Sequence, residues 1–402
     1  MAGHRRQAGA EPALSWNDAR RHAFEAGPVL PAVRRPLEAC AGTALAAPLV
    51  ALSPLPPLDT SAMDGFAVAG DGPWRVVGEV LAGERSADRL RSGTAVAVGT
   101  GAAVPPGTTA VLQVELAELR RDVPRGDVPR ADMLHGVVAP GRHIRRAGEE
   151  CRQGEALLPA GAAVTAAVLG LAAACGHDTL EVRPRPRVVG LVTGDELLLD
   201  GRPRNGRVRD ALGLQLPLLV AAHGGELVGR SHLRDDRALL RDAVSTADAE
   251  VVVTTGASSV GPADHLRGVV QDLGARLLVD GVACRPGHPQ LLARLSDGRF
   301  VVGLPGNPLA ALVATLTVLA PLLAGLGGRT LVRRAAVLDE AVPAAEAGTR
   351  LVPVRLEGLC ARPVPHAGAG MLRGAALADA LAVVPPGADL PAGAEVEVLP
   401  LS

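Results

Sequence analysis

Short apolar runs alternate with stretches of helical length over residues 184–328. Each run has the length and β-branched content of a buried strand, and each intervening stretch is long enough for a helix. Alternation at this spacing indicates a parallel α/β sheet with helices on both faces. The predicted strands are 188–192, 226–232, 250–255, 276–278 and 300–303, and the predicted helices are 211–223, 237–247, 264–273 and one that begins at Pro308.

The rest of the chain follows different patterns. Residues 62–115 contain short apolar runs separated by Gly and Pro turns, which is typical of a β-rich domain. Helical pieces precede an apolar strand near 43–50, and a further helix is predicted near 165–175. We therefore expect four parts: a mixed α/β N-terminal domain from 12–50 and 141–183, an inserted β-rich domain at 51–140, the α/β domain at 184–328, and a small C-terminal β barrel or sandwich at 329–402.

Composition narrows the functional classes. The 402 residues are 48% hydrophobic and 21% charged, which is an ordinary globular balance. A net charge of −1 gives no bulk attraction to nucleic acid or to an anionic membrane, and an aromatic content of 1% argues against base stacking. The chain has no lysine, so a lysine nucleophile or Schiff base is excluded.

Location is predicted from what the sequence lacks. The N-terminal stretch MAGHRRQAGAEPALSW has no apolar signal core, and no pair of the five cysteines has CxxC spacing. The longest apolar run, 309–326, is interrupted by Pro321 and is better explained as a buried helix than as a membrane span. We expect a cytoplasmic protein with reduced thiols, without membrane or nucleic-acid partners.

Three loops follow predicted strands, where ligands bind in open α/β sheets. They are TGDE at 193–196, TTGASSVG at 254–261 and LPGNP at 304–308. Each could expose backbone N–H groups at a helix start and so suit an anion. A Gly-Asn-Pro turn is usually only a helix start, but three such loops together favour a site. There is no Walker A or GxGxxG pattern.

Charged residues cluster near these loops. Several carboxylates converging on one cleft would suit Mg²⁺, which prefers oxygen ligands and phosphate partners. The segment CRPGHP at 284–289 adds a guanidinium and an imidazole that suit an oxyanion, although a tight Pro-Gly turn explains it equally well. The carboxylates are Asp195, Glu196, Asp235, Asp236 and Asp264.

These segments together resemble the molybdopterin molybdenumtransferases, the family that includes the gephyrin E domain. SAMDGFAV at 61–68 is similar to that family's SAMDGYAV signature, and TGDEL at 193–197 and LPGNP at 304–308 follow in the family's order. The resemblance covers roughly residues 12–400 and implies an elongated four-part subunit, a homodimer and a molybdopterin-binding-like α/β domain. The implied reaction inserts molybdate into adenylylated molybdopterin and releases AMP, with Mg²⁺ as the usual metal. A molybdopterin adenylyltransferase and molybdoenzymes are the implied partners.

The resemblance also assigns roles by motif. The implied site lies between the α/β domain of one subunit and the N-terminal domains of the other. Functional carboxylates would be Asp64, Glu150, Glu196, Asp236 and Asp264, of which Glu196, Asp236 and Asp264 would hold the metal. Substrate contacts would be Thr193, Gly194, Asp195, Gly256, Ser259, Arg285, His288, Pro289, Gly306, Asn307 and Pro308.

Several positions depart from the family pattern. Ala257, Pro262, His288 and Ala310 stand where the family has glycine, an acidic residue, lysine and serine, and the family's Asp-Ser/Thr-Asn motif reads Asp-Ala-Leu, with Ala211 at its second position. Glu150 replaces an aspartate. A catalytically degenerate paralogue that acts as a molybdopterin- or partner-binding module would show such changes. The sequence therefore leaves two hypotheses open, the transferase and the binding module.

Overall fold

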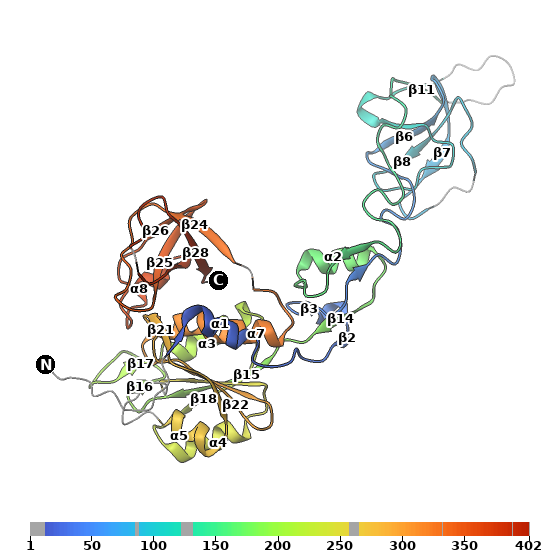
Figure 1. Ribbon diagram of the computed structural model, residues 1–402. Coiled ribbons are helices and arrows are strands. Elements are labelled where there is room, and N and C mark those ends of the chain that lie inside the picture. Colours follow the sequence, from blue (N-terminus) through green and yellow to red (C-terminus); the bar gives the residue numbers. More distant parts are fainter. Residues whose placement is uncertain are drawn as a thin grey trace, which may run out of the picture.

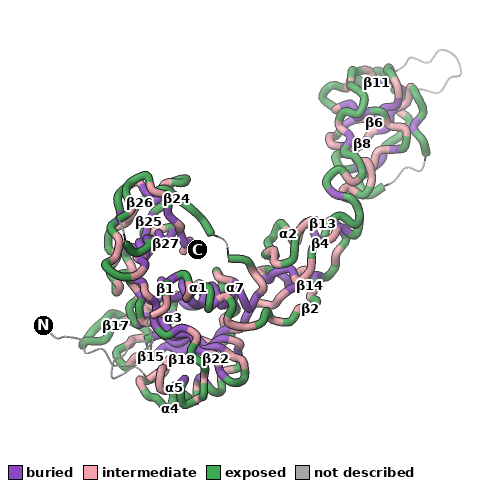
Figure 2. Tube along the Cα trace, viewed as in Figure 1, coloured by how far each residue is buried: buried purple, intermediate pink, exposed green. Residues whose placement is uncertain are grey.

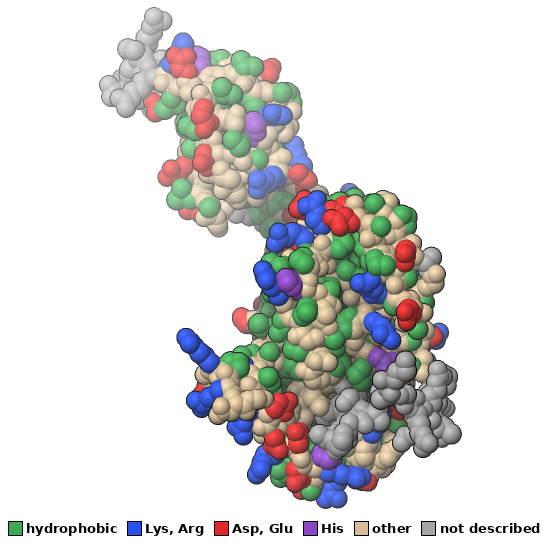
Figure 3. Space-filling view, turned by 90° about the vertical axis from the view of Figure 1, so that its left-hand side faces the viewer, with side chains coloured by type: hydrophobic (Ala, Val, Ile, Leu, Met, Phe, Trp, Pro, Cys, Tyr) green, Lys and Arg blue, Asp and Glu red, His purple; other side chains and the backbone are tan. Residues whose placement is uncertain are grey.

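The computed structural model describes residues 13–84, 88–121, 132–256, 265–331, 333–387 and 389–401. The molecule is elongated: the α/β and C-terminal domains form a large lobe, and a narrow middle module links this lobe to a β-rich domain at the far end (Figure 1). Figure 2 shows buried residues in each part, with the most extensive buried layer around the sheet of the large lobe. Arginine and carboxylate side chains are interspersed on the face shown in Figure 3.

A six-stranded sheet lies at the centre of the α/β domain, in the order β18-β15-β19-β23-β22-β20. The first four of these strands are parallel, as the alternation predicts. β22 runs antiparallel to β23 and β20, so the sheet is mixed. The reason is the short turn that joins β22 to β23, because parallel neighbours need a crossover of a dozen or more residues. The strands are β15 (Arg187–Thr193), β18 (Glu226–Leu233), β19 (Val251–Thr255), β20 (Arg276–Asp280), β22 (Leu291–Arg294) and β23 (Phe300–Leu304).

Helices cover both faces of this sheet. α3 (Leu212–Ala222) and a long C-terminal helix pack on one face, and α4 (Arg237–Thr246) and α5 (Leu266–Asp272) pack on the other. The long helix, Pro308–Leu326, is the one described helix long and apolar enough to span a membrane, and its apolar window is entirely buried in protein. The prediction of a buried core helix is confirmed. Its parts are α6 (Pro308–Ala314), a π-helical turn η3 (Thr315–Leu319) and α7 (Ala320–Leu326).

The N-terminal helix belongs to the large lobe. β1 (Leu14–Ser15) pairs with β21 (Val282–Arg285), and α1 (Trp16–Phe24) packs against the long helix. The Trp16 indole Nε1 donates to Thr317 Oγ1 at 3.1 Å. The sequence placed this segment with the elongated N-terminal domain, but the buried face of α1 finds its apolar partners on the α/β core instead.

The middle module consists of short strands and one helix. The predicted strand at 43–50 is two strands, because β3 (Ala44–Leu45) pairs with β14 while β4 (Leu49–Val50) pairs with β13. The predicted helix near 165–175 is α2 (Ala166–Ala174), and the Thr165 hydroxyl caps its first turn by accepting from the Val168 N–H. The remaining elements are β2 (Val33–Pro36), η1 (Leu37–Ala39), β13 (Ala156–Leu158) and β14 (Thr179–Arg183).

The β-rich domain is a six-stranded sheet in the order β10-β11-β7-β8-β6-β9, with a core on each side. The pairing of β5 with β12 marks where the chain enters and leaves it. Its elements are β5 (Thr60–Ser61), β6 (Gly65–Ala69), β7 (Trp74–Val80), β8 (Thr94–Val98), β9 (Ala110–Gln113), η2 (Val114–Leu116), β10 (Glu118–Arg121), β11 (Asp132–His135) and β12 (Ile144–Arg145).

The C-terminal domain is a closed ring of strands. Following the pairings β25-β26-β24-β28-β27 leads back to β25, so the predicted small barrel or sandwich is a barrel. β21 extends the sheet into the α/β domain. The elements are β24 (Arg334–Leu338), β25 (Thr349–Glu357), β26 (Cys360–Pro363), α8 (Arg373–Leu377), β27 (Ala380–Val384) and β28 (Glu395–Pro400).

Candidate functional site

The three strand-end loops converge, as the sequence predicts. β15, β19 and β23 are adjacent and parallel, so their carboxyl ends meet at one edge of the sheet. The Thr193 hydroxyl donates to the Thr255 carbonyl at 2.9 Å. A Cβ placed on Gly306 would lie 3.5 Å from the Gly256 Cα, so the second and third loops are in contact.

A pocket of about 670 Å³ opens at this edge. It takes in six of the eleven predicted substrate contacts and one of the predicted carboxylates. Those residues are Thr193, Gly256, Pro289, Gly306, Asn307, Pro308 and Glu196. The wall is completed by Arg209 and Asp210 before α3 and by Gly370 from the C-terminal domain.

Two glycines allow the loops to adopt this shape. Gly194 has a φ of +148°, and a Cβ there would lie 2.7 Å from Glu196 Oε2. Gly256 has a φ of +88°, and its Cβ would lie 2.7 Å from the Thr193 carbonyl oxygen. Because L side chains rarely adopt such φ values, substitution of either glycine would move the loop that carries Glu196 or Thr193.

Asp210 is a buried carboxylate in the pocket wall that the predicted site omitted. It is 4% exposed, and its Oδ1 accepts from the Gly213 N–H at 2.8 Å in the first turn of α3. Arg209, beside it, was also missed. Two signals were available for Asp210: it is the first residue of the altered Asp-Ser/Thr-Asn motif, and it is an acidic residue near the start of an apolar helix, where such residues commonly cap.

Asp236 does not lie in the pocket wall. It is the N-cap of α4, and its Oδ1 accepts from the Ala238 and Leu239 N–H groups at 2.8 and 2.9 Å. These two hydrogen bonds, first that from Leu239, hold the pKa of the Asp236 carboxyl below its usual value. The geometry therefore gives Asp236 a capping role through Oδ1, and its metal ligation stays a prediction.

Of the other two predicted metal ligands, only Glu196 belongs to the described residues. Glu196 lines the pocket, and Ser259 and Asp264, with the departures Ala257 and Pro262, lie outside the described residues. Within the described ranges, no group of three His, Cys, Asp or Glu side chains could hold a metal ion. Asp195 lies at the surface, where its N–H donates to Asp235 Oδ2 at 3.2 Å.

The helix start after LPGNP is already occupied. The N–H groups of Leu309 and Ala310 donate to the carbonyl of Ala369, in the C-terminal domain, at 3.0 and 3.2 Å. The expected anion site at this helix terminus is thus taken by a backbone carbonyl. Asn307 is the N-cap residue by position, but its side chain makes no capping hydrogen bond and lines the pocket instead.

Arg285 and His288, the two charged or titratable residues of the segment at 284–289, lie in different places. Arg285 lines a separate pocket of about 520 Å³, together with Arg350 and Glu346 of the C-terminal domain. Its strand pairs with β25 so that Arg285 is opposite Arg350. His288 lines neither pocket, and its Nδ1 lies 2.8 Å from the Val282 carbonyl oxygen. Arg285 and His288 therefore lie in different surroundings, and the oxyanion contact expected of each stays a prediction.

Asp64 and Glu150 lie far from the pocket along the same chain. Asp64 directly precedes β6 in the β-rich domain, at the opposite end of the molecule from β15 (Figure 1). It accepts from the Thr100 N–H at 2.6 Å and the Thr100 hydroxyl at 2.9 Å, and these bonds lower the pKa of its carboxyl. Glu150 is an exposed residue where the chain returns to the middle module. One chain does not bring these carboxylates to the pocket.

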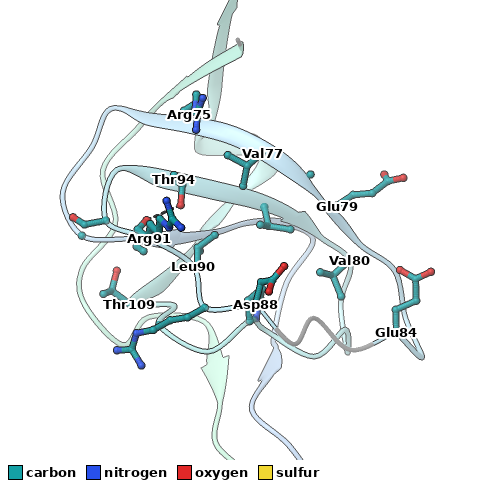
Figure 4. Close-up of a pocket in the computed structure, with 18 residues that line it drawn as sticks. Arg75, Val77, Glu79, Val80, Glu84, Asp88, Leu90, Arg91, Thr94 and Thr109 are labelled. Carbon is teal, nitrogen blue, oxygen red and sulfur yellow. Dashed lines mark hydrogen bonds between the residues drawn. The ribbon is translucent and has the colours of Figure 1, made fainter. Parts of the chain in front are cut away.

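A larger hollow of about 1470 Å³ lies on the β-rich domain (Figure 4). Arginines and carboxylates both line it, and Arg75 and Arg91 lie apart from Glu79 and Glu84 (Figure 4). None of the motif residues lines it. The candidate site is therefore the smaller pocket at the strand ends.

A pocket at the carboxyl ends of parallel strands, in a chain of this four-part build, defines a multidomain protein of the α/β class. Three family models match in order along the chain: the MoeA N-terminal region (domain I and II) at residues 14–176, a probable molybdopterin binding domain at 190–325, and the MoeA C-terminal region (domain IV) at 335–401.

Curated relatives agree with these models. The chain is 35% identical to molybdopterin molybdenumtransferase 2 of Mycobacterium tuberculosis over 297 residues, which is 69% of this chain and 71% of that protein. It is 33% identical to molybdopterin molybdenumtransferase of Haemophilus influenzae over 288 residues, 69% of each chain. The chain belongs to the molybdopterin molybdenumtransferase family.

Solved structures show the same fold. A structure of the molybdopterin biosynthesis MoeA protein from Pyrococcus horikoshii superimposes with a TM-score of 0.71 at 27% identity, covering 97% of this chain and 100% of that one. A second structure of that protein gives a TM-score of 0.74 at 23% identity, covering 96% and 99%. The predicted multidomain α/β fold class is confirmed.

Proposed function

We propose that this protein is a molybdopterin molybdenumtransferase, which inserts molybdate into adenylylated molybdopterin and releases AMP. The observation that carries the proposal is the convergence of Thr193, Gly256 and Asn307 on one pocket at the strand ends. The volume of about 670 Å³ suits a ligand of nucleotide-conjugate size bound partly in the open. The relatives whose names describe this activity support the proposal.

The molybdate would bind beside this pocket rather than in its floor. Arg285 and Arg350 flank the neighbouring 520 Å³ pocket at the border of the α/β and C-terminal domains. Two guanidinium groups supply fixed donors and positive charge to a tetrahedral oxyanion. Gly370 lies in the wall of the first pocket and Ala369 in that of the second, so one segment of the C-terminal domain borders both.

Mg²⁺ would be held by Glu196 together with the phosphates of the substrate. Mg²⁺ usually takes one or two carboxylates and completes its shell with water and phosphate oxygens, so a single pocket carboxylate fits. Its charge would neutralise the anhydride that is cleaved. Asp264 is the second proposed ligand by motif, and Asp236 is left to cap α4.

The full site would need a second copy of the chain. Asp64 and Glu150 are exposed, and Asp64 lies beside β6, at the opposite end of the chain from its own pocket (Figure 1). In a homodimer with two-fold symmetry, each N-terminal half would reach the pocket of the partner, and two equal sites would result. We propose a cytoplasmic location, with a molybdopterin adenylyltransferase supplying the substrate and molybdoenzymes accepting the product.

Single-turnover conversion of adenylylated molybdopterin by the purified protein, with Mg²⁺ and molybdate, tests the proposal. The expected result is AMP release that depends on molybdate. Tight pterin binding without AMP release would contradict the transferase and support the binding-module alternative. Absence of both binding and release would contradict both.

A further inference from the structure

Asp210 is held at both of its carboxylate oxygens. Oδ1 accepts from the Gly213 N–H at 2.8 Å, and Oδ2 lies 2.8 Å from His232 Nε2. The aspartate is 4% exposed and belongs to the pocket wall. These contacts fix the carboxylate in one orientation at the edge of the pocket.

His232 reaches Asp210 from the neighbouring strand. It lies near the carboxyl end of β18, opposite Val192 and one residue before the Leu233–Thr193 pair. Two residues earlier, Arg230 Nη1 donates to the Gly213 carbonyl. Two side chains of β18 therefore hold the start of α3. The Arg230 guanidinium bonds the backbone carbonyl of Gly213, and the His232 imidazole bonds the carboxylate of Asp210.

The space around this carboxylate is tightly limited. A Cβ on Gly213 would run into Asp210 Oδ2 and would lie 3.1 Å from Val192 Cγ2. Only glycine at position 213 lets the carboxylate lie over the first turn of α3. The close fit against Gly213 is an observation separate from the histidine contact, and both concern the same atom, Asp210 Oδ2.

We propose that His232 is a positioning residue, which holds Asp210 as an oriented acceptor for donor groups of the bound substrate. A buried carboxylate without partners is costly, and an N–H donor from His232 offsets that cost. An ionised carboxylate accepts about four hydrogen bonds, so two partners leave further acceptor capacity on Asp210. The inference rests on the proposed function, because it assigns His232 a role in that same pocket.

Two substitutions of His232 separate positioning from packing. H232L removes the N–H donor but keeps a side chain of similar size. In H232Q an amide N–H can still reach Asp210. We expect H232L to raise KM for adenylylated molybdopterin about 10-fold with less than about a 3-fold change in kcat, because a ground-state contact is lost. H232Q should return KM to within about 3-fold of the wild type.

R230M is the matched control, because it removes the other contact to the same turn and leaves Asp210 bonded to His232. Its Tm should fall while its KM stays at the wild-type value. Either an unchanged KM in H232L or an equal KM increase in R230M would overturn the inference.

Calorimetric binding of adenylylated molybdopterin to the same variants separates this inference from the proposed function. A wild type that binds but does not release AMP contradicts the proposed function alone. In that case Kd replaces KM, and H232L with a wild-type Kd overturns the positioning role. A wild type that does not bind overturns both.

Discussion

The large lobe and the N-terminal half differ in where they keep their functional residues. In the large lobe, the pocket residues lie on loops that are anchored to buried strands, and Asp210 is itself buried. In the N-terminal half, Asp64 and Glu150 are exposed at the surface of small domains. This difference supports our proposal that one half binds the substrate and that the other presents charge to a surface of a second copy.

Removing the charge of Asp64 should give the largest loss of activity and should separate turnover from binding. D64N keeps an oxygen that accepts from the Thr100 N–H, so the local turn should survive. We expect AMP release to fall at least about 100-fold with little change in pterin affinity, because none of the residues that line the pocket is changed. Single-turnover assays paired with calorimetry measure both quantities. Turnover near the wild-type rate would remove Asp64 from the mechanism.

Glu196 provides the opposite test within the large lobe. E196Q removes a pocket carboxylate but keeps its size, so the expected effect is a fall in turnover of about 30-fold and a higher Mg²⁺ concentration at half-maximal rate. A Mg²⁺ titration of both proteins gives the answer. The control is E149Q, since Glu149 is an exposed carboxylate that accepts from the Arg146 N–H within its own turn. An unchanged Mg²⁺ dependence in E196Q would contradict the assignment of Glu196 to the metal.

Acid should destabilise the large lobe before the β-rich domain. His223, at the end of α3, has its pKa lowered to about 4 by burial and by the nearby charges of Arg20 and Arg329. The unfolded chain binds this proton near pH 6.5 and the folded chain does not, so stability is lost as pH falls from about 6.5 towards 4. The loss attributable to His223 is at most about 3 kcal/mol.

H223L removes this titration. Denaturant unfolding at pH 7 and pH 5 should show a smaller difference for H223L than for the wild type. Hydrogen exchange should place the acid-induced loosening in α1 and α3 rather than in β6–β8. Equal pH dependence in the two proteins would show that His223 is not the responsible group.

Asp236 gives the smallest expected effect and decides between its two roles. D236A should lower stability by about 1 kcal/mol through loss of the N-cap. D236S keeps a capping oxygen and should recover most of that stability. If Asp236 only caps α4, D236S keeps wild-type turnover. A large loss of turnover in D236S would restore the predicted catalytic role.

Much of the fold could be predicted because its signals are local. Strand–helix alternation placed β15, β18, β19 and β23, and the loops after three of them met as expected. β22 could not be placed the same way, because a short apolar run carries no information about strand direction. The sequence also could not assign α1 to the large lobe, because an amphipathic pattern shows that a helix has a buried face but not which surface that face packs against.

The sequence predicted the pocket residues that lie on strand-end loops. It missed residues whose place in the site depends on a hydrogen-bond partner far along the chain. Asp210 is the first residue of the altered Asp-Ser/Thr-Asn motif, but this position does not reveal its partner His232, which lies 22 positions further along the chain. Asp236 shows the converse ambiguity: an acidic residue at a helix start satisfies both a metal-site pattern and a capping pattern. Hydrogen bonds from Ala238 and Leu239 show the cap, and the metal role stays a prediction.

The most direct test of the two-region account mixes two inactive variants. D64N and E196Q are each purified, unfolded together and refolded as a mixture, and AMP release is measured against each variant refolded alone. If Asp64 of one chain serves the pocket of its partner, half the dimers are mixed and each has one intact site, so about a quarter of wild-type activity returns. Activity no greater than that of the separate variants would contradict a site shared between two chains.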